Sequence, residues 1–201
     1  LMKILVIHQY FLEQGGAGGS RFNQFAKYWA AEGHQVTIIA GTSGLQTDPE
    51  QKIKYKNKWV VRKDYAPGIT VLRCFVSGEY YKNFVGRLWG YLTFTLSSTW
   101  AIFFRIQRPD IIIATSPPLF VAIPGYLAKI FRRVPLIFEI RDLWPKFAID
   151  AGVLKNSIII KFSYWLENFI YRKASLINVL TPAYREYLLT KNNVPENKII
   201  Y

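Results

Sequence analysis

The sequence has little of what disulfide, metal or serine chemistry requires. Cys74 is the single cysteine among 201 residues, which excludes a disulfide framework and a thiolate metal cluster and fits a reducing compartment. The two histidines, His8 and His34, form no H-x-x-x-H or H-E-x-x-H pattern, so we expect no metal site built by protein ligands alone. A G-x-S-x-G motif and a G-K-[ST] phosphate loop are also missing, which removes support for a serine hydrolase or a P-loop protein.

Acidic residues are scarce. The chain has 13 Asp and Glu against 26 Lys and Arg, a formal net charge of +13. Such an excess predicts an anionic partner, either nucleic acid, a phosphorylated ligand or lipid headgroups. No RNP, KH or helix-turn-helix pattern accompanies the charge, so we do not expect a nucleic-acid partner.

Long apolar runs are also rare, with one exception. Residues 88–104 carry no charge and are flanked by Arg87 and Arg105. Their length is at the short limit of the roughly 17–25 residues that a membrane span needs. Because five Ser or Thr interrupt the run, we expect a buried or interfacial helix rather than a span.

The segments that are present alternate between strand and helix patterns. A strand at 3–8, a helix after Ser20 and a strand at 35–40 make one strand–helix–strand unit, and further apolar strands follow at 111–115, 134–140 and 175–180. Strands that are apolar on both faces predict an α/β fold, with a Rossmann-like, mostly parallel sheet and helices on both faces. Residues 42–80 interrupt the alternation as a basic loop and hairpin insertion that turns at Pro67–Gly68.

A glycine-rich loop follows the first strand. Four glycines within residues 15–19 lead into the helix, where free amides and the helix dipole favour phosphate. We therefore predict that this loop, with Gly16, Gly18 and Gly19, contacts phosphate or sugar and that Arg21 adds a cation; a plain flexible turn is the alternative. A nicotinamide fingerprint does not fit, because Arg21 occupies the position of the third glycine.

Other candidate residues stand at the carboxyl ends of predicted strands, where open α/β sheets bind ligands. Asp142 is the candidate catalytic residue, as a base or an acceptor for a ligand hydroxyl; alternatively it caps a following helix or pairs with Arg141. Glu13 is a weaker acid–base candidate, and Ser116 and Arg141 stand at the ends of two of these strands; the family resemblance given below makes all three acceptor-binding candidates. His8 fits a hydrogen-bonded structural histidine better than a catalytic one.

Two segments, 52–59 and 79–91, mix cations with aromatic residues. This mixture is typical of a surface at a membrane interface, where rings lie at headgroup depth and cations meet anionic lipid. It also suits single-stranded nucleic acid, and a solvated charged loop is the remaining alternative.

Several of these motifs, taken in order, resemble glycosyltransferase family four, the retaining enzymes of GT-B fold. The closest likeness is to a bacterial branch that builds surface polysaccharide and O-antigen, including fucosamine-type transferases. The likeness covers nearly the whole chain and rests on "KILVIHQYFLEQGGAGGSR", "GHQVTIIAG", "PDIIIATSPP" and "IFEIRDLWP".

The resemblance implies that residues 1–201 are the N-terminal, acceptor-side domain of a two-domain enzyme, without the C-terminal donor-binding domain. The substrates would be a nucleotide-diphosphate sugar and a saccharide on a polyprenyl diphosphate, with no metal or other cofactor, and this fragment alone would be inactive. Many relatives have histidine where Arg141 stands, so no histidine role carries over. Retention is often explained by the leaving phosphate taking the acceptor's proton, which weakens the case for Asp142 as a base.

The resemblance also gives the charge a role. A basic, aromatic acceptor domain would be cytoplasmic and would lie peripherally on the inner face of the bacterial cell membrane, which supplies the lipid acceptor. The alternative function is a stand-alone Rossmann-like module that binds a nucleotide without catalysis.

Overall fold

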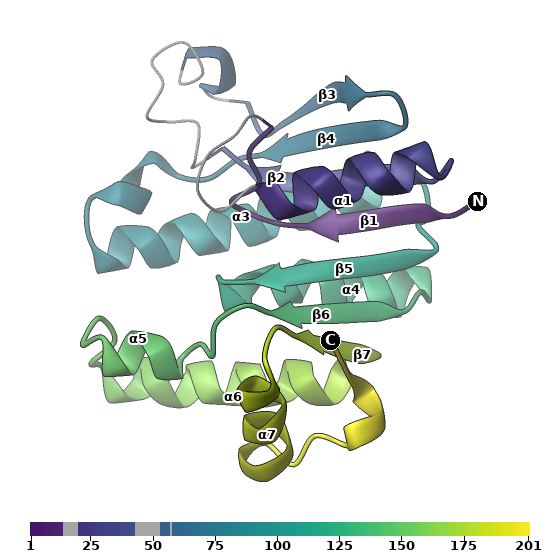
Figure 1. The fold of residues 1–201 in the computed structure, drawn as a ribbon. Helices are drawn as coiled ribbons and strands as arrows, with labels where there is room; N and C mark the ends of the chain where they lie inside the picture. Colours follow the sequence, from purple (N-terminus) through teal and green to yellow (C-terminus); the bar gives the residue numbers. More distant parts are fainter. Residues whose placement is uncertain (14–19, 43–52, 57) are drawn as a thin grey trace.

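The computed structural model describes residues 1–13, 20–42, 53–56 and 58–201, and these form one α/β sandwich (Figure 1). Its eight-stranded sheet has the order β3-β4-β2-β1-β5-β6-β7-β8, and every neighbouring pair is parallel except β3 with β4. The mostly parallel, Rossmann-like sheet is confirmed. The strands are β1 (Lys3–Ile7), β2 (Gln35–Gly41), β3 (Val60–Ala66), β4 (Ile69–Cys74), β5 (Ile111–Ser116), β6 (Leu136–Ile140), β7 (Leu176–Val179) and β8 (Ile199–Ile200).

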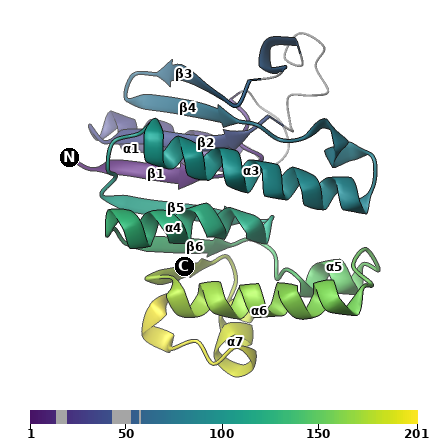
Figure 2. The same ribbon diagram turned by 180° about the vertical axis from the view of Figure 1, so that it is seen from behind.

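Helices cover both faces of the sheet, as the apolar strands require. The α-helices whose bounds matter here are α1 (Ser20–Ala31), α3 (Phe84–Phe104), α4 (Ala122–Arg132), α5 (Lys146–Asp150), α6 (Ser157–Lys173) and α7 (Pro182–Lys191). Helix α1 packs on one face, where Phe22 and Ala26 join Val6 and Ile38 in an apolar core. Helices α3, α4 and α6 lie side by side on the opposite face (Figure 2). The larger core is on that side.

The predicted hairpin is confirmed in the basic insertion. Strands β3 and β4 pair antiparallel across a turn in which Gly68 has a φ of +76°, a left-handed conformation that favours glycine. Exposed side chains of Arg62, Lys63 and Asp64 line the middle of β3. The remainder of the 42–80 segment is described only in part, because residues 43–52 and 57 lie outside the described residues.

The long apolar run forms α3. The sequence pattern predicts a helix from about residue 82 to 107, and α3 is shorter at both ends. Asn83 caps its first turn, accepting a hydrogen bond from the backbone N–H of Gly86 at 2.7 Å. Among the helices that the structure describes, none is long and apolar enough to cross a membrane.

Candidate functional site

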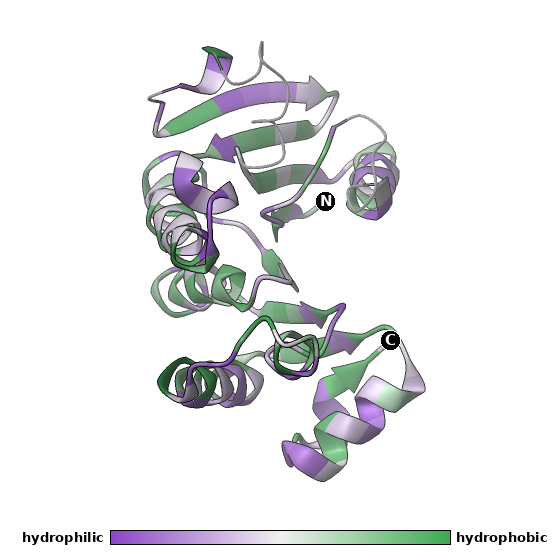
Figure 3. Cartoon of the chain, turned by 90° about the vertical axis from the view of Figure 1, so that its left-hand side faces the viewer, coloured by the Kyte–Doolittle hydropathy of each residue, from purple (hydrophilic) through white to green (hydrophobic). Residues whose placement is uncertain are grey.

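The carboxyl ends of β1, β5, β6 and β7 meet at one edge of the sheet, which we call the strand-tip edge; Figure 3 looks onto it. His8 follows β1, Ser116 ends β5, and Arg141 and Asp142 follow β6. The backbone N–H of Arg141 donates to the carbonyl oxygen of Ser116 at 3.3 Å. Parallel pairing therefore brings His8, Ser116 and Arg141, which the sequence placed at or next to strand ends, to the same edge.

A buried carboxylate organises the middle of this edge. Glu139, the penultimate residue of β6, is only 3% exposed. It forms an ion pair with Arg21 of α1, and Thr115 Oγ1 and Asn178 Nδ2 donate to its two oxygens at 2.8 and 3.2 Å. Arg21 was predicted to meet the donor phosphate; the structure shows its guanidinium held beside the strand tips by Glu139, at 36% side-chain exposure.

His8 is buried among guanidinium groups. Arg141 Nη1 lies 3.4 Å from its Nε2. Because a guanidinium can only donate, Nε2 accepts and the ring proton resides on Nδ1. Burial is the largest cause that lowers the pKa of His8, followed by the charges of Arg141, Arg21 and Arg73 in that order, and together they lower it from 6.5 to about 3. The ring is therefore neutral near neutral pH, and three cations surround it.

We expect His8→Gln to flatten the acid side of the stability profile. The pKa of His8 is 6.5 unfolded and about 3 folded, so its neutral form contributes stability above pH 6.5 that is lost as the pH falls toward 3. From about pH 7 to about pH 5 the parent should lose about 2 kcal/mol more than the variant. Urea unfolding at several pH values in this range gives the free energy of unfolding of both proteins. Subtracting one from the other removes the contributions of the other titrating groups, which the two proteins share. If the parent and the variant lose the same stability between these pH values, the low pKa of His8 in the folded protein is wrong.

Arg73 fixes the segment after β1 from inside the protein. It is 1% exposed in β4, and its Nη1 donates to the carbonyl oxygens of Phe11 at 2.7 Å and Gly41 at 3.1 Å. Its Nη2 donates to Glu13 Oε1 at 3.1 Å, while Lys63 pairs with the other oxygen of Glu13. Burial opposes ionisation of Glu13, but the hydrogen bonds and charges of Lys63 and Arg73 outweigh it and lower its pKa.

The sequence offered Glu13 as an acceptor-binding residue. The structure shows both of its carboxylate oxygens engaged with the β3–β4 hairpin, so Glu13 joins that hairpin to the loop after β1. Contact with an acceptor stays a prediction.

Asp142 is half-buried in the loop between β6 and α5. Capping of a following helix was one alternative for it, and this alternative is wrong: α5 begins after Pro145, and its N-terminus has no side-chain cap. The catalytic role of Asp142 stays a prediction. Gly16, Gly18 and Gly19 lie outside the described residues, and their predicted phosphate contacts stay predictions too.

An aromatic cluster borders the same edge near the start of α3. The hydroxyls of Tyr10 and Tyr80 are 2.7 Å apart, Tyr80 packs edge-on against Tyr91, and Tyr91 stacks on Phe120 with ring centroids 5.5 Å apart. Burial raises the pKa of Tyr10 and of Tyr91, so both stay protonated. Beside them, a small cavity of about 40 Å³ lies between α3 and α5; its lining includes Leu88, Tyr91, Trp144 and Leu154.

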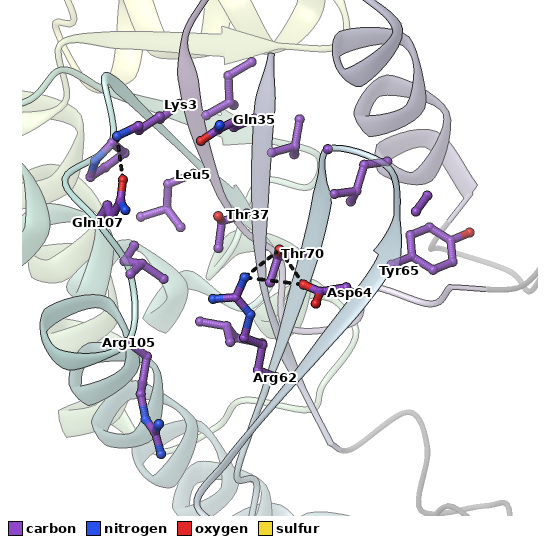
Figure 4. Close-up of a pocket in the computed structure, with 18 of the residues that line it drawn as sticks. Lys3, Leu5, Gln35, Thr37, Arg62, Asp64, Tyr65, Thr70, Arg105 and Gln107 are labelled. Carbon is purple, nitrogen blue, oxygen red and sulfur yellow. Dashed lines mark hydrogen bonds and ion pairs between the residues drawn. The ribbon is translucent and has the colours of Figure 1, made fainter. Parts of the chain in front are cut away.

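A larger hollow lies elsewhere. A groove of about 600 Å³ lies at the amino ends of β1, β2 and β4, opposite the strand-tip edge (Figure 4). Its polar side chains largely satisfy one another: Arg62 contacts both Asp64 and Thr70, and Lys3 donates to Gln107 at 2.6 Å. No predicted site residue lines this groove, so we do not place the site there.

Sequence reasoning missed Glu139 and Arg73 as organisers of the site. Each was visible as a single charged residue within an apolar strand, "LIFEI" and "ITVLRC". A charge is rarely buried unless it is paired, and this signal could have identified both.

Comparison with known proteins supplies the family. The sequence pattern described as "Glycosyl transferase 4-like domain" matches residues 16–201. Comparison with curated proteins gives no match.

Several solved structures share the fold. Sucrose-phosphate synthase from Thermosynechococcus elongatus is similar with a TM-score of 0.63 and 13% identity, over 94% of this chain and 44% of that one. The catalytic domain of starch synthase IV from Arabidopsis thaliana, bound to ADP and acarbose, has a TM-score of 0.61 and 13% identity, over 99% and 50%. Anabaena Alr3699/HepE in complex with UDP-glucose has a TM-score of 0.52 and 15% identity, over 100% and 43%.

This chain thus spans about half the length of these proteins or less. At such low identity the likeness concerns the fold, which is a Rossmann-like half of the GT-B architecture. The family follows from the sequence match over residues 16–201: the chain belongs to the glycosyl transferase 4-like domains.

Proposed function

We propose that this chain is the N-terminal, acceptor-side domain of a retaining glycosyltransferase. The enzyme would transfer a sugar from a nucleotide-diphosphate donor to a saccharide on a polyprenyl diphosphate, in synthesis of O-antigen or a related surface polysaccharide. A hexose or aminosugar such as fucosamine is the proposed donor sugar, and no metal is required. The reaction would take place at the cytoplasmic, inner face of the bacterial cell membrane.

The observation that carries the proposal is the positive charge at the strand-tip edge in a chain of this family. Arg141 contacts a neutral His8, the half-buried Arg21 lies beside the strand tips, and the buried Arg73 adds to the same positive field. Guanidinium groups match phosphate in charge and in fork geometry. A diphosphate that gains charge as its bond to the sugar breaks would be stabilised at such an edge. In support, one structural neighbour is described as a complex with UDP-glucose.

Within this proposal each predicted residue has a role. The glycines Gly16, Gly18 and Gly19 approach the donor's phosphates or sugar, with Arg21 nearby. Ser116, Arg141 and Glu13 face the acceptor side. Asp142 contacts a hydroxyl of the sugar or acceptor, while the leaving phosphate takes the acceptor's proton.

The test is sugar transfer by the complete gene product, from labelled nucleotide sugars to a polyprenyl-diphosphate-linked saccharide. We expect Arg141→Gln to lower kcat/KM about a hundredfold, as removal of one positioned donor does. Asp142→Asn should cost about tenfold if no protein base is needed. Arg62→Gln, on the exposed side of β3, is the matched control, and residues 1–201 alone should not transfer. Full activity of Arg141→Gln would refute the assignment.

The alternative, a nucleotide-binding module without catalysis, makes a different prediction. Its reading frame would stop near Tyr201, and the protein would bind a nucleotide sugar without consuming it. A reading frame that continues for a second domain of similar size favours the transferase.

A further inference from the structure

The polar and apolar residues of helix α3 are distributed in the reverse of the usual way for a surface helix. Its buried side is made largely of glycines and hydroxyl residues, and its exposed side is made of large apolar ones. The buried hydroxyls are satisfied within the helix: Thr93, Thr95 and Ser98 donate to the carbonyl oxygens of Gly90, Tyr91 and Phe94 at 2.9, 2.9 and 2.6 Å. A helix on a water-exposed surface normally has the opposite pattern.

The exposed side of α3 forms a continuous apolar stripe. Of the seven exposed residues in α3, only Arg87 is charged. The other six recur every three or four positions, which places them on one side of the helix, and their exposed fractions run from 36% to 72%. We call this set the α3 ridge: Val85, Trp89, Leu92, Leu96, Trp100 and Phe104. It extends along a helix of about 30 Å, which is larger than the scattered apolar residues of ordinary surfaces.

The ridge continues onto α4 and is bordered by cations. Phe103 meets the exposed Phe131 of α4 edge-on, with ring centroids 5.7 Å apart. The guanidinium of Arg132 lies 5.6 Å from the Phe103 ring, and that of Arg105 lies 5.2 Å from the Trp100 ring. Tryptophan beside arginine is the pairing found at membrane interfaces.

The helices of this face carry an excess of positive charge. Helices α3 and α4 contain no acidic residue, and the one acid of α6, Glu167, is buried. Cations on the three helices include Arg87, Lys129, Arg132 and Lys161. Glu79, an exposed acid just before α3, is paired with Lys82. An apolar stripe with an excess of cations around it complements an anionic lipid surface.

We propose that the α3 ridge, together with Phe131, is the surface by which this domain binds an anionic bilayer. The inference rests on the proposed function, because the lipid acceptor would come from the same bilayer. Helix α3 starts at the strand-tip edge, where Tyr91 of α3 stacks on Phe120 after β5. Docking along α3 therefore brings the predicted site to headgroup depth.

A second copy of the chain suits this surface less well. Two ridges packed face to face would bring Arg87, Arg105 and Arg132 of one copy close to cations of the other. Like charges oppose such contact. A bilayer with anionic headgroups supplies the missing negative charge.

Vesicle flotation of the purified protein tests the ridge. The vesicles are phosphatidylcholine alone, or phosphatidylcholine with about a third of phosphatidylglycerol. We expect binding only to the anionic vesicles, and at least a tenfold loss of binding for Trp89→Ser/Leu96→Ser/Phe104→Ser. The matched control, Phe25→Ser/Tyr28→Ser on the exposed side of α1, should bind as the parent does. Circular dichroism confirms that both variants are folded.

A second pair of substitutions tests the charge. Arg87→Gln/Arg105→Gln should weaken binding to anionic vesicles by about fivefold for each charge removed. The proposal is overturned if the ridge variant binds as the parent does, or if the parent binds both vesicle types equally. It is also overturned if the ridge variant only converts a dimer to a monomer and leaves vesicle binding unchanged.

The experiments can refute membrane binding by the α3 ridge and the proposed glycosyltransferase function separately. With a short-chain acceptor dissolved in detergent, the complete ridge variant should transfer sugar as the parent does, because no ridge residue lines the strand-tip edge. If neither the parent nor the ridge variant transfers sugar, while the parent still binds anionic vesicles through the ridge, the proposed function is refuted and the membrane-binding proposal stands.

Discussion

Replacing Arg73 with methionine should lower the free energy of unfolding by about 3 to 5 kcal/mol, the usual cost of breaking a buried charged pair. The variant keeps the length of the side chain but removes a cation that is 1% exposed. The carbonyl oxygens of Phe11 and Gly41 then lose their Arg73 donor, and Glu13 keeps only Lys63 as a cationic partner. Buried acceptors without donors are costly.

Guanidinium unfolding at neutral pH measures this loss. The matched control is Arg62→Met in β3, whose side chain is well exposed and contacts Asp64 at 3.4 Å; it should change stability by less than about 0.5 kcal/mol. The same Arg73 variant should also weaken binding of a nucleotide sugar, because the segment after β1 loses its anchor. A change as small as that of the control would show that water or other donors replace Arg73.

Removing the carboxylate of Glu139 should cost about 3 kcal/mol. Glu139→Ala deprives Arg21, Thr115 and Asn178 of their common acceptor. The figure lies at the low end for a buried pair, because Arg21 is about a third exposed and can regain water. Glu139→Gln keeps the shape and an acceptor oxygen, so it should cost about half as much.

A double-mutant cycle isolates the ion pair. Glu139→Gln and Arg21→Met, made singly and together and compared by thermal and urea unfolding, should show a coupling of about 1 to 2 kcal/mol. Glu186→Ala, an exposed acid on α7, is the control and should be nearly neutral. Strict additivity of the two substitutions would show that the pair does not stabilise the folded state.

The architecture could be predicted from the sequence because it depends on local pattern. Apolar strands separated by helical periods define the sheet, and Pro67–Gly68 defines the antiparallel turn between β3 and β4. The short helix α5 was not expected, since five residues carry too little periodicity to be recognised. The bounds predicted for α3 were too wide by a few residues at each end, because no sequence pattern marks where its terminal turns begin and end.

The positions of the strand-end residues could be predicted, but their contacts could not. Parallel strands must bring His8, Ser116 and Arg141 to one edge, and they do. Which charges pair cannot be read from spacing, because Arg21 and Glu139 are 118 positions apart, and Arg73 and Glu13 are 60 apart. Those partners are chosen by packing of distant segments, so two predicted ligand residues, Arg21 and Glu13, also hold structural ion pairs.

The reversed direction of β3 has a consequence for aggregation. A parallel sheet that ended at β4 would expose an apolar edge strand, which can pair with another chain. Strand β3 covers it and presents Arg62, Lys63 and Asp64 as the new border. Charged borders resist recruitment of further strands. Amyloid-type growth by strand addition is therefore discouraged at this border of the sheet.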